Sequence, residues 1–165
     1  MRILIVSDTH KHNENLEKVI DKIGPIDMII HCGDAEGTED CIRYSVDCPM
    51  YIVAGNNDYF SELDGEMMFD VDRYKVFLTH GHYYYVNMGT ERLVEEAKSR
   101  GADIVIYGHT HKPKMEVYDG VVVLNPGSIS YPRQNGRIPT YMIMDIDEKG
   151  DVCYTLHHVP KVNKS

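Results

Sequence analysis

The chain has 165 residues, of which 42% are hydrophobic and 26% are charged, and its formal net charge is −9. This length predicts one domain over residues 1–165 with a substantial buried core. The negative charge and the lack of a basic stripe argue against long nucleic acid or an anionic membrane surface as the main partner. No apolar run approaches the ~20 residues of a membrane span, and the N-terminus lacks the layout of a signal peptide, so we expect a cytoplasmic protein.

The first half of the chain alternates between short apolar runs and amphipathic segments. Three apolar runs predict buried strands: residues 2–6, 27–31 and 50–54. Between them, Asn13 is a candidate N-cap for a helix that ends at Gly24-Pro25, and residues 38–46 predict a second helix. This order implies parallel strands joined by right-handed crossovers. Ligands of such sheets bind beyond the carboxyl ends of the strands, which is where the polar motifs of this chain stand.

The second half of the chain is richer in strands. One helix is predicted at 90–100, ended by Gly101. Seven runs predict strands, most of them in hairpins: 66–71, 74–79, 103–107, 114–118, 121–124, 140–146 and 151–159. Residues 125–128, Asn-Pro-Gly-Ser, are typical of a turn. The predicted fold class is therefore α/β, with two packed mixed β-sheets flanked by helices on their outer faces.

Polar side chains that can bind metals follow five of these strands. Seven potential ligands stand there: Asp8, His10, Asp34, Asn56, His80, His109 and His111. One tetrahedral zinc ion needs only four ligands, so seven suit two ions about 3.5–4 Å apart that share a carboxylate. Nitrogen and oxygen ligands fit Mn²⁺, which we favour, as well as Fe, Zn²⁺, Ni²⁺ or Co²⁺. The sequence has neither a Ser-His-Asp order nor a phosphate-binding P-loop.

At these residues the chain resembles the calcineurin-like metallophosphoesterases. Five motifs in the family's order carry the resemblance: Asp8-Thr9-His10, Gly33-Asp34, Gly55-Asn56-Asn57-Asp58, His80 and Gly108-His109-Thr110-His111. The short length and the Asn-Pro-Gly-Ser turn are similar to the small prokaryotic, YfcE-type phosphodiesterases. The resemblance implies a first metal held by Asp8, His10 and His111. It implies a second held by Asn56, His80 and His109. Asp34 would bridge both, together with a water or hydroxide that attacks phosphorus.

Four further residues are predicted to act on substrate. Asn57 stands where many members of the resembling family carry a histidine that protonates the leaving group, and its alternative is a plain turn residue. His82 is predicted to be catalytic or to contact substrate, or else to support the ligands from behind. Ser128 and Arg133 are candidate phosphate donors, against the alternative of a turn with a surface arginine. Asp58 is expected to orient the ligand loop without binding metal.

The predicted function is a metal-dependent phosphodiesterase that acts on small phosphodiesters, with Asp34, Asn57 and His82 as its catalytic residues. Whether monoesters are also hydrolysed depends on position 57. The alternative is a protein-interaction scaffold, the use that the eukaryotic retromer complex makes of the same fold with a degraded metal set. A homo-oligomer is compatible with the sequence.

Overall fold

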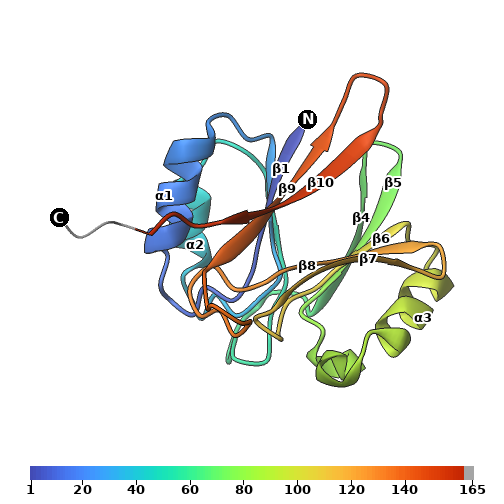
Figure 1. Ribbon diagram of the computed structural model, residues 1–165. Helices are drawn as coiled ribbons and strands as arrows, with labels where there is room; N and C mark the ends of the chain where they lie inside the picture. The colour runs from blue at the N-terminus through green and yellow to red at the C-terminus, as the bar shows by residue number, and fades with distance from the viewer. Residues whose placement is uncertain (162–165) are drawn as a thin grey trace.

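Two five-stranded sheets pack face to face in the computed structural model, which describes residues 1–161 (Figure 1). The first sheet has the order β10-β9-β1-β2-β3: Val152–His158, Thr140–Ile146, Arg2–Val6, Met28–His31 and Met50–Ile52. The second has the order β4-β5-β6-β8-β7: Glu66–Val71, Tyr74–Thr79, Ile104–Ile106, Val121–Pro126 and Pro113–Tyr118. Each sheet has three parallel strands, β1-β2-β3 and β5-β6-β8, next to antiparallel ones. Both sheets are therefore mixed, as predicted.

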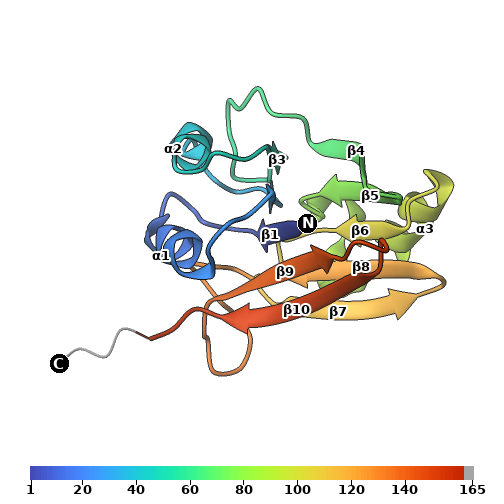
Figure 2. The same cartoon turned by 90° about the horizontal axis from the view of Figure 1, so that it is seen from above.

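Helices cover the outer faces of this sandwich. Figure 2 shows α1 (Glu14–Ile23) and α2 (Glu39–Tyr44) on the side of β1, and α3 (Glu91–Ser99) on the opposite side, next to β5 and β6. Two short 3-10 helices, η1 (His82–Tyr84) and η2 (Val86–Met88), connect β5 to α3. No helix within residues 1–161 is long and apolar enough to span a membrane.

Alternating side chains of the central strands build three apolar layers. Ile3 and Ile5 of β1 face the second sheet, whereas Leu4 packs with Leu16 of α1. In the second sheet, Phe77 of β5 packs under α3 with Leu93, Val94 and Ala97, and its neighbours along β5 face the first sheet. Because both faces of each central strand are buried, these strands read as continuous apolar runs, which is why the sequence predicted them.

The strand ends that carry the polar motifs meet at one edge of the sandwich, the end toward which β1 runs downward from the N-terminus in Figure 1. Backbone hydrogen bonds join the loops there. Asp8 N–H donates to the carbonyl of Gly33 (3.1 Å), and His10 N–H donates to the carbonyl of Asp34 (2.9 Å). Gly108 N–H donates to the carbonyl of His80 (3.0 Å), so loops from both sheets form one surface.

Two local predictions hold only in part. Asn13 is the N-cap residue of α1, as predicted, but its side chain makes no capping hydrogen bond; its side-chain oxygen Oδ1 instead accepts a hydrogen bond from the Thr38 hydroxyl (3.4 Å). The first two residues of the turn predicted at 125–128 belong to a strand instead, because β8 continues through Pro126. The buried side-chain amide of Asn125 donates to the carbonyl of Gly108 (3.1 Å), which ties the end of β8 to the histidine loop.

Candidate metal centre

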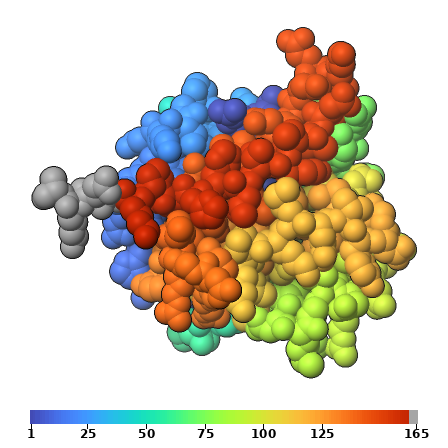
Figure 3. Space-filling view, viewed as in Figure 1, coloured from blue at the N-terminus to red at the C-terminus, as the bar shows by residue number. Residues whose placement is uncertain are grey.

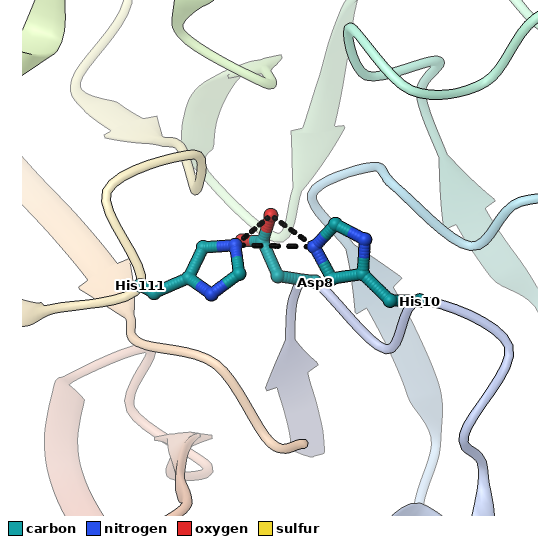
Figure 4. Close-up of side chains that lie close together, drawn as sticks. All are labelled: Asp8, His10 and His111. Atoms are coloured by element: carbon teal, nitrogen blue, oxygen red, sulfur yellow. Dashed lines mark hydrogen bonds and ion pairs between the residues drawn. The ribbon is translucent and has the colours of Figure 1, made fainter. Parts of the chain in front are cut away.

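Asp8, His10 and His111 form the first ligand group (Figure 4). The two imidazoles approach the Asp8 carboxylate from opposite sides, with Asp8 Oδ1 3.2 Å from His111 Nε2 and 3.7 Å from His10 Nε2. The two Nε2 atoms lie 3.1 Å apart. Three potential donor atoms from two loops that are 101 residues apart in the chain thus converge on one point.

The other four predicted ligands, Asp34, Asn56, His80 and His109, lie directly beside this group. Asp34 Oδ2 is 3.3 Å from His80 Nε2. The side-chain oxygen Oδ1 of Asn56 is 3.0 Å from both His80 Nε2 and His109 Nδ1. The structure therefore brings all seven predicted ligands into one cluster.

The two carboxylates connect the groups. Asp8 Oδ1 is 3.8 Å from His80 Nε2, and Asp34 Oδ2 is 3.7 Å from His10 Nε2, so each carboxylate reaches histidines of both groups. Asp8 is completely buried, and its Oδ2 accepts hydrogen bonds from the Ser7 hydroxyl (2.5 Å) and the His109 N–H (3.1 Å). Within residues 1–161, its Oδ1 has no hydrogen-bond partner. A buried anionic oxygen without a partner is costly, and a cation at this point would satisfy it. The cluster thus fits divalent metal ions.

Three of the histidines are oriented through their other ring nitrogen. His80 Nδ1 bonds to the carbonyl of Cys32 (2.7 Å), His111 Nδ1 to the carbonyl of Tyr131 (2.6 Å), and His10 Nδ1 to the Glu36 carboxylate (2.9 Å). Each of these acceptors requires a proton on Nδ1, which leaves the Nε2 lone pair directed into the cluster. Such partners are typical of metal-binding histidines.

In the absence of metal, protons would occupy part of the cluster. Burial lowers the pKa values of His10 and His80, but the Asp8 and Asp34 carboxylates more than offset this effect, so both pKa values rise above 6.5. Conversely, burial raises the pKa of Asp34, but His80 and Asn57 lower it overall to about 2. Metal and protons should therefore compete for the same nitrogen atoms.

This competition predicts how metal changes stability with pH. A histidine whose pKa is raised by folding stabilises the metal-free protein below pH 6.5, and this contribution is lost as the pH rises through the folded pKa. We expect the Tm of metal-stripped protein to fall between pH 6 and pH 8. Added Mn²⁺ at ~100 times its Kd should raise Tm by roughly 5–10 °C at pH 8, and by less at pH 6. Calorimetry of metal-stripped and Mn²⁺-loaded protein at pH 6 and pH 8 measures the fall in Tm with pH and the rise in Tm with Mn²⁺.

His111→Ala should abolish most of the gain from Mn²⁺. His158→Ala is the matched control, because His158 is exposed on β10, outside the cluster, and its loss should leave the gain unchanged. A wild-type Tm that does not respond to Mn²⁺ at pH 8 would contradict a metal centre.

The backbone of the cluster is strained in a way that the sequence did not indicate. Five of the seven predicted ligands have left-handed φ values between 46° and 70°: Asp8, His10, Asp34, His109 and His111. Non-glycine residues rarely adopt this conformation, and such strain concentrates at functional sites. Close packing adds a second constraint, since a Cβ atom at Gly55 would overlap the Asp34 carboxylate and one at Gly108 would overlap the Ser7 hydroxyl.

Asp58 holds two ligand loops together. Its carboxylate accepts the backbone N–H groups of Asp34 (2.8 Å), Glu36 (2.6 Å) and Gly55 (2.6 Å). These bonds fix the loop after β2 against the loop after β3. The Asp58 carboxylate thus fixes the two loops that carry predicted ligands, and that it binds no metal itself stays a prediction.

The predicted substrate residues differ in where they lie. Asn57 contacts the cluster, because its backbone N–H and its side-chain amide donate to the two oxygens of Asp34 (2.9 Å each). His82 lies on η1 with its ring centre 5.4 Å from that of His80 and 6.1 Å from that of His109. Arg133 is exposed and lines a cavity next to His10.

The prediction that Ser128 faces the substrate is wrong. Ser128 is completely buried, and its hydroxyl donates to the carbonyl of Asp8 (2.8 Å) while accepting N–H bonds from Ser130 (3.2 Å) and Tyr131 (2.7 Å). Its role is to hold the loop after β8 against the end of β1. A serine in a turn pattern gives no sign of this long-range contact.

Four residues at the site were not singled out by sequence reasoning: Ser7, Glu36, Tyr131 and Arg137. Ser7 precedes a ligand directly, and a hydroxyl next to a buried carboxylate is the one signal that could have indicated a supporting role. The other three reach the cluster or its adjoining cavity only through tertiary packing.

Known proteins resemble this chain in sequence and in fold. The profile of the calcineurin-like phosphoesterase superfamily domain matches residues 1–149. A protein from Methanocaldococcus jannaschii named as a phosphodiesterase is 32% identical over 90% of this chain and 95% of its own. A predicted phosphoesterase from Streptococcus pneumoniae has a solved structure that superposes with a TM-score of 0.77 at 27% identity, over 95% of this chain and 97% of that one. Vps29 from Entamoeba histolytica has the same fold, with a TM-score of 0.77 at 23% identity over 96% and 99% of the two chains.

Proposed function

Because this chain belongs to the calcineurin-like phosphoesterase superfamily, we propose that it is a phosphodiesterase that works with two divalent metal ions. The observation that carries the proposal is the cluster of seven potential ligands, which includes the buried, unpartnered Asp8 Oδ1. Seven donors exceed the ligand set of one tetrahedral ion, and two carboxylates that each reach both groups suit a pair of ions.

In this proposal each half of the cluster would hold one ion. Asp8, His10 and His111 would hold the first, Asn56, His80 and His109 would hold the second, and Asp34 would be shared. The nitrogen and oxygen donors favour Mn²⁺, with Fe, Zn²⁺, Ni²⁺ or Co²⁺ as the other candidates. Divalent ions supply positive charge to phosphate oxygens and make water more acidic near neutral pH.

The chain's own residues position the ligands and the phosphate. In hydrolysis, a water oxygen forms a bond to phosphorus, the bond from phosphorus to one ester oxygen breaks, and the leaving alkoxide takes up a proton. Asn57 holds Asp34 through both of its oxygens. Its amide neither gains nor loses a proton near neutral pH, so it gives the leaving group no acid. Esters with good leaving groups, such as aryl diesters, should therefore be preferred over alkyl esters.

His82 is the remaining candidate for a direct role. It is half-buried on η1, and its Nδ1 has no hydrogen-bond partner among the described residues. Its ring lies against that of Tyr83 with their centres 4.0 Å apart. In the proposal, His82 contacts a phosphate oxygen or an ester arm at the side of the second ion.

Hydrolysis of bis(4-nitrophenyl) phosphate and 4-nitrophenyl phosphate tests the proposal. Chelator-treated protein should be inactive, and adding Mn²⁺ should restore turnover of the diester with a kcat/KM above that for the monoester. Activity that survives chelation, or a reconstituted protein that cleaves neither compound, would overturn it.

The alternative of a protein-interaction scaffold receives less support. A scaffold has no need of a complete set of metal ligands, and here all seven are in place around the same cluster. The likeness to Vps29 concerns the fold alone.

A further inference from the structure

A cavity of about 660 Å³ adjoins the first ligand group. His10, Glu36 and His111 line it from the cluster, and Tyr131, Pro132, Arg133 and Arg137 line it from the loop between β8 and β9. The cavity is wide open to solvent and its volume is in the range of sites for small organic molecules, so one arm of a diester whose phosphorus lies at the metal centre can extend into it. The loop between β8 and β9, which carries Tyr131, Arg133 and Arg137, lies at the lower left of the molecule, in orange (Figure 3).

This loop is fixed directly to a metal ligand. His111 Nδ1 bonds to the carbonyl of Tyr131 (2.6 Å), and Arg133 N–H donates to the carbonyl of His111 (3.0 Å). Beyond Arg133, a turn is closed by bonds from Arg137 N–H to the carbonyl of Gln134 (3.0 Å) and from Gln134 Nε2 to the carbonyl of Ile138 (2.7 Å). The cavity therefore keeps a defined position relative to the cluster.

The charges at the cavity point to an anionic ligand. Neither Arg133 nor Arg137 has a side-chain hydrogen bond or ion pair within residues 1–161, although the chain carries a net charge of −9. The carboxylate in the lining, Glu36, is engaged by His10 Nδ1 (2.9 Å). Guanidinium groups bind phosphate through paired N–H donors, so two of them without partners suit an anionic ligand.

The remaining lining suits a ring. Tyr131 is 45% exposed and meets the His10 ring edge-on, with 5.5 Å between the ring centres. Pro132 lies next to it in the lining. A half-exposed tyrosine ring in this lining can pack against a planar group of a ligand.

We infer that this cavity is a subsite for a nucleotide-like ester arm, a ring followed by a second phosphate, which Tyr131 and the pair Arg133 and Arg137 recognise. The inference rests on the proposed function, since it places the scissile phosphorus at the metal centre. It adds the class of substrate: phosphodiesters that carry a further phosphate group on one arm.

Two substrates that differ by one phosphate test the inference. Thymidine 5′-(4-nitrophenyl phosphate) and its 3′-phosphorylated form share the scissile bond and the leaving group. We expect the wild type to prefer the 3′-phosphorylated form in kcat/KM by about tenfold or more, the effect of one charge-assisted hydrogen bond. Arg137→Ala and Arg133→Ala should each reduce this ratio, and Arg137→Lys should retain part of it.

Arg73→Ala is the matched control. It makes the same change in net charge at the exposed turn between β4 and β5, at the opposite end of the strand from His80, and should leave the ratio unchanged. A wild-type ratio near one, or a ratio that neither cavity arginine affects, would overturn the inference.

Measurements of ligand binding test the subsite independently of the proposed catalytic function. Calorimetric titration with thymidine 3′,5′-bisphosphate and thymidine 5′-monophosphate needs no turnover. The bisphosphate should bind more tightly, Arg137→Ala should reduce the difference, and Tyr131→Ala should weaken both ligands while keeping their ratio. If neither diester is hydrolysed but these binding differences hold, the subsite stands and the proposed function fails; equal affinities of the wild type for both ligands would overturn the subsite.

Discussion

Asp34→Asn should lower kcat/KM for aryl diesters by at least ~10², with the fold retained, because the loss of one preorganised charged group at a reaction centre typically has this effect. Asp34 is buried, and its Oδ2 lies between His10 and His80. An amide there has one negative charge fewer to face divalent ions. Steady-state kinetics at saturating Mn²⁺, with circular dichroism to confirm folding, measures the effect.

The control for this substitution is Asp72→Asn. Asp72 is exposed in the turn between β4 and β5, and its left-handed φ of 52° is one that asparagine adopts readily. The Asp72→Asn protein should hydrolyse diesters at the wild-type rate. If Asp34→Asn also did so and still bound metal normally, Asp34 would have no part in the centre.

Asn57→His should raise activity on esters with poor leaving groups. A histidine there could protonate the leaving oxygen, a contribution typically worth ~10²–10⁴ in rate, whereas the asparagine amide cannot. The gain should be largest for alkyl esters and small for 4-nitrophenyl esters, whose leaving group departs without help. A series of aryl and alkyl esters of graded leaving-group pKa measures this dependence in both proteins.

Asn57→Ala distinguishes the effect of a new acid at position 57 from the effect of losing the hydrogen bond to Asp34. The amide of Asn57 donates to Asp34 Oδ2 (2.9 Å), so any substitution at this position also changes the support of Asp34. Asn57→Ala removes that bond without adding an acid and should lower activity about equally on all esters. An Asn57→His protein with the same leaving-group dependence as wild type would show that position 57 has no acid role.

The sequence predicted the cluster because each ligand follows an apolar run. Asp8, Asp34 and Asn56 come after three parallel strands of one sheet, whose carboxyl ends share an edge. His80 and His109 follow β5 and β6, which are parallel in the other sheet. Periodicity and motif order were therefore enough to indicate both the two-sheet α/β fold and which residues would meet.

The same reasoning could not predict the contacts that hold the cluster in place. Ser128 looked like a turn residue because its pattern is local, but its hydroxyl bonds to the carbonyl of Asp8, 120 residues away. The left-handed φ values of His10 and His111 go against their local preferences and depend on tertiary support. Likewise, Arg137 reaches the cavity only because hydrogen bonds anchor its loop to His111.

A paired titration of metal-stripped protein with Mn²⁺ tests the central claim most directly. Bound metal and hydrolysis of bis(4-nitrophenyl) phosphate are measured on the same samples. The two-ion account predicts binding that saturates at two ions per chain, no hydrolysis before metal is added, and full hydrolysis only when both ions are bound. Saturation at one ion with full activity, or hydrolysis by the metal-free chain, would contradict it.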